Sequence, residues 1–174
     1  MRLGLALLAF LALAGCGFQP MYGGFQGAAL KGQLANIGID PIPDRVGQIL
    51  RQNLLEEMGG NGKASDYTLR VTLNTKAEGS GFRADEASTR TNLTLTAQYK
   101  LVRVSDDHVM FDDEAVVFAA YDVVESDFAT LTARQDTERG LAEQAARLIG
   151  TRLAAYFRTE KQQAAANEAP AAGH

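Results

Sequence analysis

The residues with the clearest chemistry close a short apolar leader, where Leu13, Ala14 and Gly15 precede Cys16. Cys16 is the only cysteine in the chain. A thiol in this position is the acceptor pattern of a bacterial lipoprotein: the sulfur takes a diacylglycerol, the leader is cut before it, and the new amino group is acylated. The cationic start and the apolar run that follows are typical of a secretory signal peptide. We therefore predict a lipoprotein signal peptide over residues 1–15 and lipidation at Cys16.

The length of the leader bears on how the protein is attached to a membrane. The apolar run 3–13 spans roughly 16 Å as a helix, about half a hydrocarbon core, which argues against a permanent transmembrane helix. Several acyl chains, palmitate among them, make an effectively stable anchor where a single chain does not. Gly17 follows the cysteine in place of the aspartate that favours inner-membrane retention. We expect the outer membrane, on its periplasmic side; the alternative is an ordinary signal peptide with a cysteine near its cleavage site.

A second set of chemically suggestive residues is basic. Lys76, Arg83 and Arg90 fall in a predicted polar loop of about a dozen residues between two strands, longer than most hairpin connections. Charge-assisted contacts to phosphate are strong, so these cations could bind the phosphates of a lipid while Phe82 touches an acyl chain. Three carboxylates leave the same stretch locally neutral, which favours a solvated loop without a ligand: Glu78, Asp85 and Glu86.

Residues that could support catalysis or hold a metal are few. His108 lies in a predicted turn and His174 ends the chain, and no nucleophile elbow of the G-x-S-x-G type accompanies either. The acidic pairs near His108 lack the spacing of a calcium loop. We predict no enzyme activity, no metal site and no cofactor.

Composition narrows the class of protein further. Removal of residues 1–15 takes one arginine, so the mature chain carries 16 − 21 = −5 charges, which argues against general nucleic-acid binding. The remaining 159 residues (174 − 15) suit one ordinary domain. With Cys16 lipidated, no disulfide can form within the chain, so packing alone must hold the fold.

Apolar periodicity predicts strands and helices in the order β-α-β-β-β-α. The strands alternate apolar and polar residues, and the helices carry one apolar stripe each. We predict an α+β fold with two helices packed on one face of a four-stranded mixed sheet. The first two strands should be parallel and the later ones antiparallel, while the strand order stays open. The predicted elements cover residues 33–39, 44–58, 67–74, 93–101, 109–121 and 133–158.

The segments outside this domain look irregular. Residues 16–32 hold many glycines and are predicted to be a lipidated tether. Residues 159–174 have no large apolar side chain and are predicted to be a disordered tail. The folded domain is therefore expected to span residues 33–158.

Three segments carry a further signal: the mature start at 16–23, the Ile-Pro-Asp-Arg-Val-Gly-Gln segment at 42–48 and the strand at 97–101. Together with the order of elements, they resemble the LptE family of lipopolysaccharide-assembly lipoproteins. The resemblance implies a plug inside the LptD β-barrel that helps the barrel assemble and helps pass lipopolysaccharide to the outer leaflet. In that setting Lys76, Arg83 and Arg90 are the candidate lipopolysaccharide contacts.

Two other interpretations remain open from the sequence. The chain could be an auxiliary lipoprotein of a lipid-transporting ABC system, which has a different partner but a similar size and plan. It could also be a lipid-anchored hydrolase that uses His108.

Overall fold

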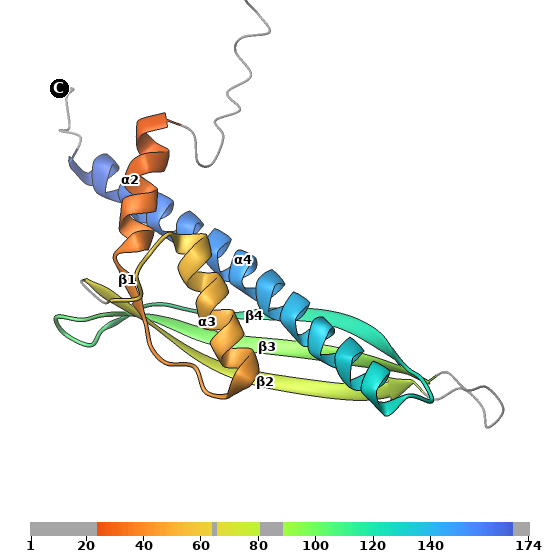
Figure 1. Ribbon diagram of the computed structural model, residues 1–174. Helices are drawn as coiled ribbons and strands as arrows, with labels where there is room; N and C mark the ends of the chain where they lie inside the picture. Colours follow the sequence, from red (N-terminus) through yellow and green to blue (C-terminus); the bar gives the residue numbers. More distant parts are fainter. Residues whose placement is uncertain (1–23, 64–65, 81–88, 169–174) are drawn as a thin grey trace, which may run out of the picture.

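The computed structural model describes residues 24–63, 66–80 and 89–168 (Figure 1). Its elements follow the order α-β-α-β-β-β-α, so one helix precedes the six predicted elements. The helices and strands are α2 (Gly24–Ala35), β1 (Ile37–Ile39), α3 (Asp44–Met58), β2 (Tyr67–Ser80), β3 (Thr89–Arg103), β4 (Val109–Val123) and α4 (Asp127–Glu168).

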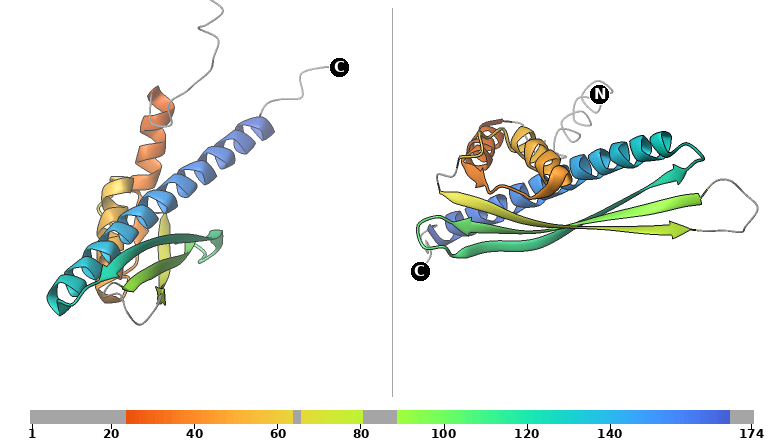
Figure 2. Two further views of the ribbon diagram at one scale, coloured as in Figure 1. Left: turned by 90° about the vertical axis from the view of Figure 1, so that its right-hand side faces the viewer. Right: turned by 60° about the horizontal axis from the view of Figure 1, so that its bottom comes forward.

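The four strands form one mixed sheet in the order β1-β2-β3-β4. Strand β1 is parallel to β2, while β2 with β3 and β3 with β4 are antiparallel, as predicted. The strand order, left open by the sequence, follows the order along the chain because two hairpins join the last three strands. Figure 2 shows that these three strands are long and strongly twisted.

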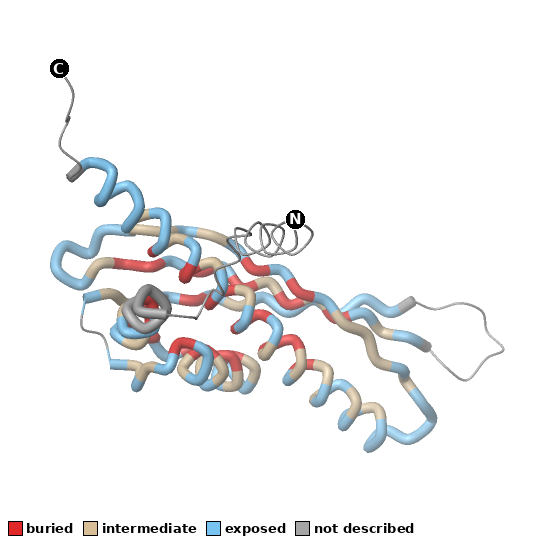
Figure 3. Tube along the Cα trace, turned by 90° about the horizontal axis from the view of Figure 1, so that it is seen from above, coloured by how far each residue is buried: buried red, intermediate tan, exposed pale blue. Residues whose placement is uncertain are grey.

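Helices α3 and α4 lie on one face of the sheet, which confirms the predicted α+β fold (Figures 1 and 2). Helix α4 runs obliquely over β3 and β4, and α3 packs beside it. The buried residues lie between these layers (Figure 3). On β3 every second residue is buried: Leu93, Leu95, Ala97, Tyr99 and Leu101. Burying each large apolar side chain of this kind stabilises the fold by roughly 1.5–3 kcal/mol.

Helix α2 occupies a segment that the sequence predicted to be irregular. The tether prediction is wrong for residues 24–32, and the predicted strand beginning at residue 33 is confined to Ile37–Ile39. Leu30 and Leu34 are one helical turn apart and both are buried in the core. Packing of these two leucines against α3 and α4 therefore outweighs the low helix propensity of the glycines.

Helix α4 is longer than predicted at both ends. It begins at Asp127 rather than near residue 133, and Ser126 caps it by accepting a hydrogen bond from the Ala129 N–H at 3.3 Å. It continues to Glu168, so the prediction of a disordered tail is wrong for residues 159–168. Residues 161–167 are exposed. Their Lys, Gln and Ala residues extend an existing helix without a buried face, because elongation is much less costly than nucleation.

The start of α3 is tightly built, although no side chain caps it. Pro43 is the N-cap residue and makes no side-chain cap bond. Asp44 is the first helical residue, with φ of 65°. A Cβ on Gly47 would lie 2.6 Å from Cγ2 of Ile42, so the buried Ile42 requires glycine one turn into the helix.

In the described part of the chain, no helix is both long enough and apolar enough to cross a membrane.

Candidate ligand-contact face of the sheet

One face of the sheet is left uncovered by helices, and we call it the open face. Its side chains alternate along β2, β3 and β4 with the buried ones, and the strand register aligns them in transverse rows. Most are polar and none of them is buried. Along the three strands they are Thr68, Arg70, Thr72, Asn74, Lys76, Glu78, Arg90, Asn92, Thr94, Thr96, Gln98, Lys100, Asp112, Glu114, Val116, Phe118, Ala120 and Asp122.

Two of the predicted contact residues, Lys76 and Arg90, lie on this face but not in a loop. The predicted loop from Lys76 to Arg90 is wrong at both ends, because β2 continues to Ser80 and β3 begins at Thr89. The apolar alternation ends early in β2, since Thr75 and Ala77 on the helix side are exposed there. Without a buried side, this half of the strand carries no apolar signal that a sequence could reveal.

Lys76 is paired with an acidic neighbour on its own strand. Its ammonium nitrogen lies 2.5 Å from Oε1 of Glu78. The hydrogen bond and the negative charge of Glu78 raise the pKa of Lys76, and Lys76 lowers the pKa of Glu78 in the same way. Both side chains are exposed, so the pair is weak and a phosphate could replace the carboxylate as partner of the ammonium.

The end of the open face where the chain passes from β2 to β3 is called the hairpin end. Arg90 lies two rows nearer this end than Lys76 does, and the two rows are about 14 Å apart along the strands at the usual rise per residue. The register places it directly opposite Asp122 of β4. Opposite charges facing each other across strands are mildly stabilising. Arg83 and Phe82, the other two residues of the predicted contact set, lie outside the described residues.

Phe118 is the open-face residue that the sequence analysis missed. It is 78% exposed and is aligned with Thr94 of β3, which is aligned in turn with Lys76 of β2. The row therefore carries an aromatic ring, a hydroxyl and a cation across three strands. The signal was present but ambiguous, because Val116 to Phe118 form a continuous apolar run that hides which residue faces outward.

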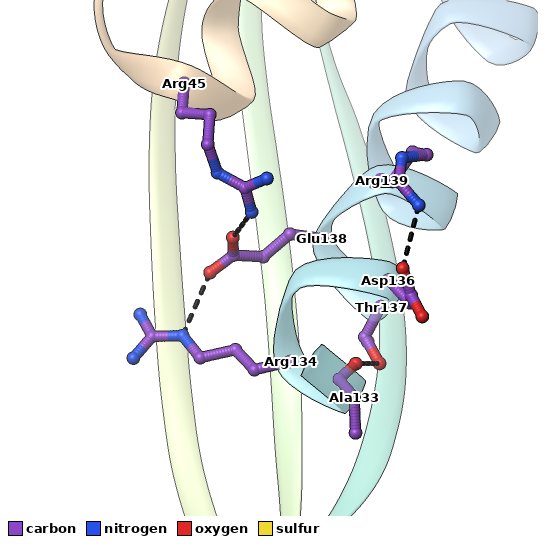
Figure 4. A network of polar contacts seen from close by, with 7 residues as sticks. All are labelled: Arg45, Ala133, Arg134, Asp136, Thr137, Glu138 and Arg139. Carbon is purple, nitrogen blue, oxygen red and sulfur yellow. Dashed lines mark hydrogen bonds and ion pairs between the residues drawn. The ribbon is translucent and has the colours of Figure 1, made fainter. Parts of the chain in front are cut away.

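An ion-pair network on the helix side of the sheet was also missed (Figure 4). Glu138 of α4 is only 9% exposed and accepts from two guanidinium groups. Arg45 of α3 donates from Nη2 to Oε2 at 2.7 Å, and Arg134 of α4 donates from Nε to Oε1 at 2.9 Å. Arg45 and Glu138 are 93 residues apart in sequence, so no local pattern indicates their contact. The network joins the first turn of α3 to α4 and is structural.

A second polar cluster joins α4 to the sheet. The Tyr99 hydroxyl donates to Oδ2 of Asp113 at 3.2 Å, and Arg152 donates to the same oxygen at 2.8 Å. Arg152 also donates to the carbonyl oxygen of Glu114 at 2.6 Å. Burial raises the pKa of Tyr99 to about 12. The Glu114 N–H, together with Arg152, lowers the pKa of Asp113.

His108 lies exposed in the turn between β3 and β4, as predicted for a solvated turn residue. Its backbone N–H donates to Oδ1 of Asp106 at 3.2 Å. Within the described ranges, no three metal-ligating side chains of the His, Cys, Asp or Glu types come together.

The fold and its open polar face define a one-sided α+β module that presents a broad sheet surface. The family model described as "LptE: Lipopolysaccharide-assembly" matches residues 34–153, which is more than half of the chain. The chain therefore belongs to the LptE family of lipopolysaccharide-assembly lipoproteins, as the resemblance predicted.

Solved structures agree with this fold. A protein of Caulobacter crescentus CB15, described as a lipoprotein, superposes with a TM-score of 0.65 at 23% identity, over 75% of this chain and 97% of that one. The minor lipoprotein from Acinetobacter baumannii gives a TM-score of 0.50 at 16% identity, over 71% and 94% of the two chains. At these identities the likeness shows the fold alone. The comparison with curated proteins found no match.

Proposed function

We propose that the chain is an outer-membrane lipoprotein, anchored through Cys16, that sits inside an LptD-type β-barrel. There it helps the barrel to assemble and assists the transfer of lipopolysaccharide to the outer leaflet. The observation that carries the proposal is the family match over residues 34–153, which spans the sheet and most of both packed helices. The family's role is lipopolysaccharide assembly, which requires no catalytic group of this chain.

The open face supports a place within a barrel. The interior of an outer-membrane barrel is polar, and the open face is dominated by threonine, asparagine, glutamine and charged side chains of both signs. The chain has a helix layer on one side and a wide polar sheet surface on the other. The polar sheet surface can therefore rest against such a wall.

The hairpin end of the open face is the proposed contact region for lipopolysaccharide. Lys76 and Arg90 supply cations there, and Phe118 supplies an apolar surface in the same row as Lys76. Lipid A carries phosphates beside acyl chains, so a ligand of this kind suits cations and an exposed ring on one surface. Arg83 belongs to the same proposed set through its place in the chain between β2 and β3.

Isolation of the intact, lipidated protein in mild detergent tests the partner. We expect a large outer-membrane β-barrel in stoichiometric amount, identified by mass spectrometry. The matched control is the Cys16→Ala protein, which should keep the folded domain and lose the lipid anchor. A chain recovered without any barrel contradicts the proposal, and recovery with inner-membrane transporter subunits instead favours an auxiliary role in an ABC system.

A further inference from the structure

The outer edge of β4 is a long row of peptide groups without a neighbouring strand. Strand β4 is the last of the sheet, and over the described ranges it pairs only with β3. Such an edge is a ready template for another extended chain. The opposite edge is formed by the three buried residues of β1 and, beyond them, by β2 from Arg70 to Ser80. That stretch of β2 carries the charged residues Arg70, Lys76 and Glu78, which disfavour pairing with another strand.

The middle of this edge lacks the features that usually prevent pairing. Residues 115–121 read Ala-Val-Val-Phe-Ala-Ala-Tyr and contain no charge, no proline and no glycine. Val116 is 46% and Phe118 is 78% exposed. The irregularity between β3 and β4 lies at Leu101 and Val102, away from this segment. Natural edge strands are normally protected by lysine, proline or a bulge.

We propose that residues 115–121 of β4 accept an extended segment of another protein as a fifth strand, with apolar residues in its centre and basic residues at both ends. Backbone hydrogen bonds would supply affinity, and alternate side chains would contact Val116 and Phe118. This inference goes beyond the proposed function and does not require a barrel partner.

Acidic residues on either side of the segment 115–121 favour an incoming strand that has basic residues at its ends. Asp112, Asp113 and Glu114 precede the apolar segment, and Asp122 and Glu125 follow it. Arg152 neutralises Asp113 and Lys100 pairs with Asp112. Glu114 accepts a hydrogen bond from the side-chain amide of Gln98, and Asp122 faces Arg90 of β3. Among the described residues, neither of these two carboxylates nor Glu125 forms a salt bridge, so the two ends of the edge keep a negative charge. An incoming strand with basic ends is therefore matched at both ends, whichever direction it runs.

The same charges disfavour a second copy of this chain as the occupant. Antiparallel pairing of two β4 edges centred on Phe118 places residue i opposite residue 236 − i. Glu114 then faces Asp122 of the other copy, twice in the symmetric pair. Like charges directly opposite each other across strands are destabilising.

The kind of segment that can bind is also restricted by its own backbone. A strand within a closed barrel wall already pairs on both sides and has no free edge. The occupant must therefore be an extended loop or terminus, or a strand at the edge of an open sheet.

A synthetic peptide, acetyl-Lys-Thr-Val-Thr-Val-Thr-Val-Thr-Lys-amide, tests the proposal on the full-length lipidated protein in detergent. Aligned with residues 114–122, it places its lysines opposite Glu114 and Asp122 and its central valine opposite Phe118, all on the open face. We expect amide hydrogen exchange over residues 115–121 to slow by about tenfold or more when the peptide is bound. A peptide methylated on every backbone nitrogen keeps the side chains and loses all the donors, so it should give no slowing. Equal protection by both peptides, or protection by neither, would overturn the proposal.

Phe118→Lys places a charge on the edge and should abolish the slowing. Val104→Lys is the matched control, because Val104 is also about half exposed (52%) but lies in the turn after β3. It should bind the peptide as the unchanged protein does. If the free protein is a dimer whose segment 115–121 is already protected, and Phe118→Lys makes it monomeric, the occupant is a second copy and the proposal is wrong.

Discussion

Lys76 on β2 and Phe118 on β4 lie in one transverse row of the open face, with Thr94 of β3 aligned between them. The two side chains are 42 residues apart in sequence (118 − 76), and only the register of two hairpins brings them onto one line. The row combines a cation with an exposed ring at the hairpin end of the sheet. This juxtaposition makes the open face a better candidate for lipid contact than a flexible loop would be.

Charge reversal at Lys76 and Arg90 should weaken binding of purified lipopolysaccharide to the full-length protein. For Lys76→Glu with Arg90→Glu, we expect the affinity to fall about tenfold, because both proposed phosphate contacts become repulsive. Titration of the lipopolysaccharide by calorimetry measures the change.

Lys100→Glu is the control for the single reversal Lys76→Glu, because both substitutions change the net charge by the same two units. Lys100 is on the same face and pairs with Asp112 at 3.3 Å much as Lys76 pairs with Glu78, but it lies toward the other end of the sheet. Its affinity should stay near that of the unchanged protein. An equal loss for Lys100→Glu would show that net charge, and not the hairpin end, determines binding.

Phe118 should be dispensable for folding, in contrast to its neighbour on the other side of the sheet. Phe118→Ser should change the free energy of unfolding by less than about 0.5 kcal/mol, because the ring is largely exposed. Leu95→Ala removes a side chain that is 1% exposed and should cost about 2–5 kcal/mol. Urea denaturation of both variants makes the comparison, and a large loss for Phe118→Ser would place that ring in a packed contact.

Glu138 should stabilise the contact between α3 and α4. Glu138→Gln leaves two guanidinium groups without their shared carboxylate, and we expect a cost of about 1–2 kcal/mol, reduced by the partial exposure of both arginines. Asp136→Asn is the control, since the Asp136–Arg139 pair is exposed and should contribute less than about 0.5 kcal/mol. Thermal unfolding in low salt distinguishes the two, and equal effects would contradict a special role for Glu138.

The buried hydroxyl of Tyr99 should make the protein sensitive to alkaline pH. Its pKa is raised from 10.0 to about 12 in the folded chain, so the folded state binds more protons than the unfolded state between these pH values. The free energy of unfolding must then fall as pH rises from about 10 to about 12. Tyr99→Phe removes the titrating group and should flatten this decline, which denaturation at pH 8 and pH 11 measures. An unchanged slope would mean that Tyr99 does not remain protonated in the folded protein.

The alternation of apolar residues was sufficient to predict the sheet where one of its faces is buried. The second and third strands and α3 follow from such patterns, and Gly59 ends α3 in the left-handed conformation, with φ of 67°, that a glycine C-cap predicts. The sequence did not predict the parts of the strands and helices whose side chains are no longer buried. The distal half of β2 is exposed on both sides, and the last turns of α4 are exposed all round, so neither carries a periodic signal.

Helix α2 shows the converse case, in which long-range packing decides local structure. Leu30 and Leu34 are its buried residues from position 30 onward. Nothing near them in sequence indicates that α3 and α4, which α2 contacts, come close to this segment.

The sequence by itself determined the lipoprotein acceptor pattern at Cys16 and the α+β class, because these depend on residue types and on short-range periodicity. The family followed from the resemblance to known relatives and from the family match over residues 34–153. The tertiary structure alone decided which side chains share the open face, that Glu138 lies between two arginines, and that the apolar middle of β4 is an unpaired edge. Those relationships depend on strand register and on the crossing of helices over the sheet, which bring together residues too distant along the chain for any local pattern to encode.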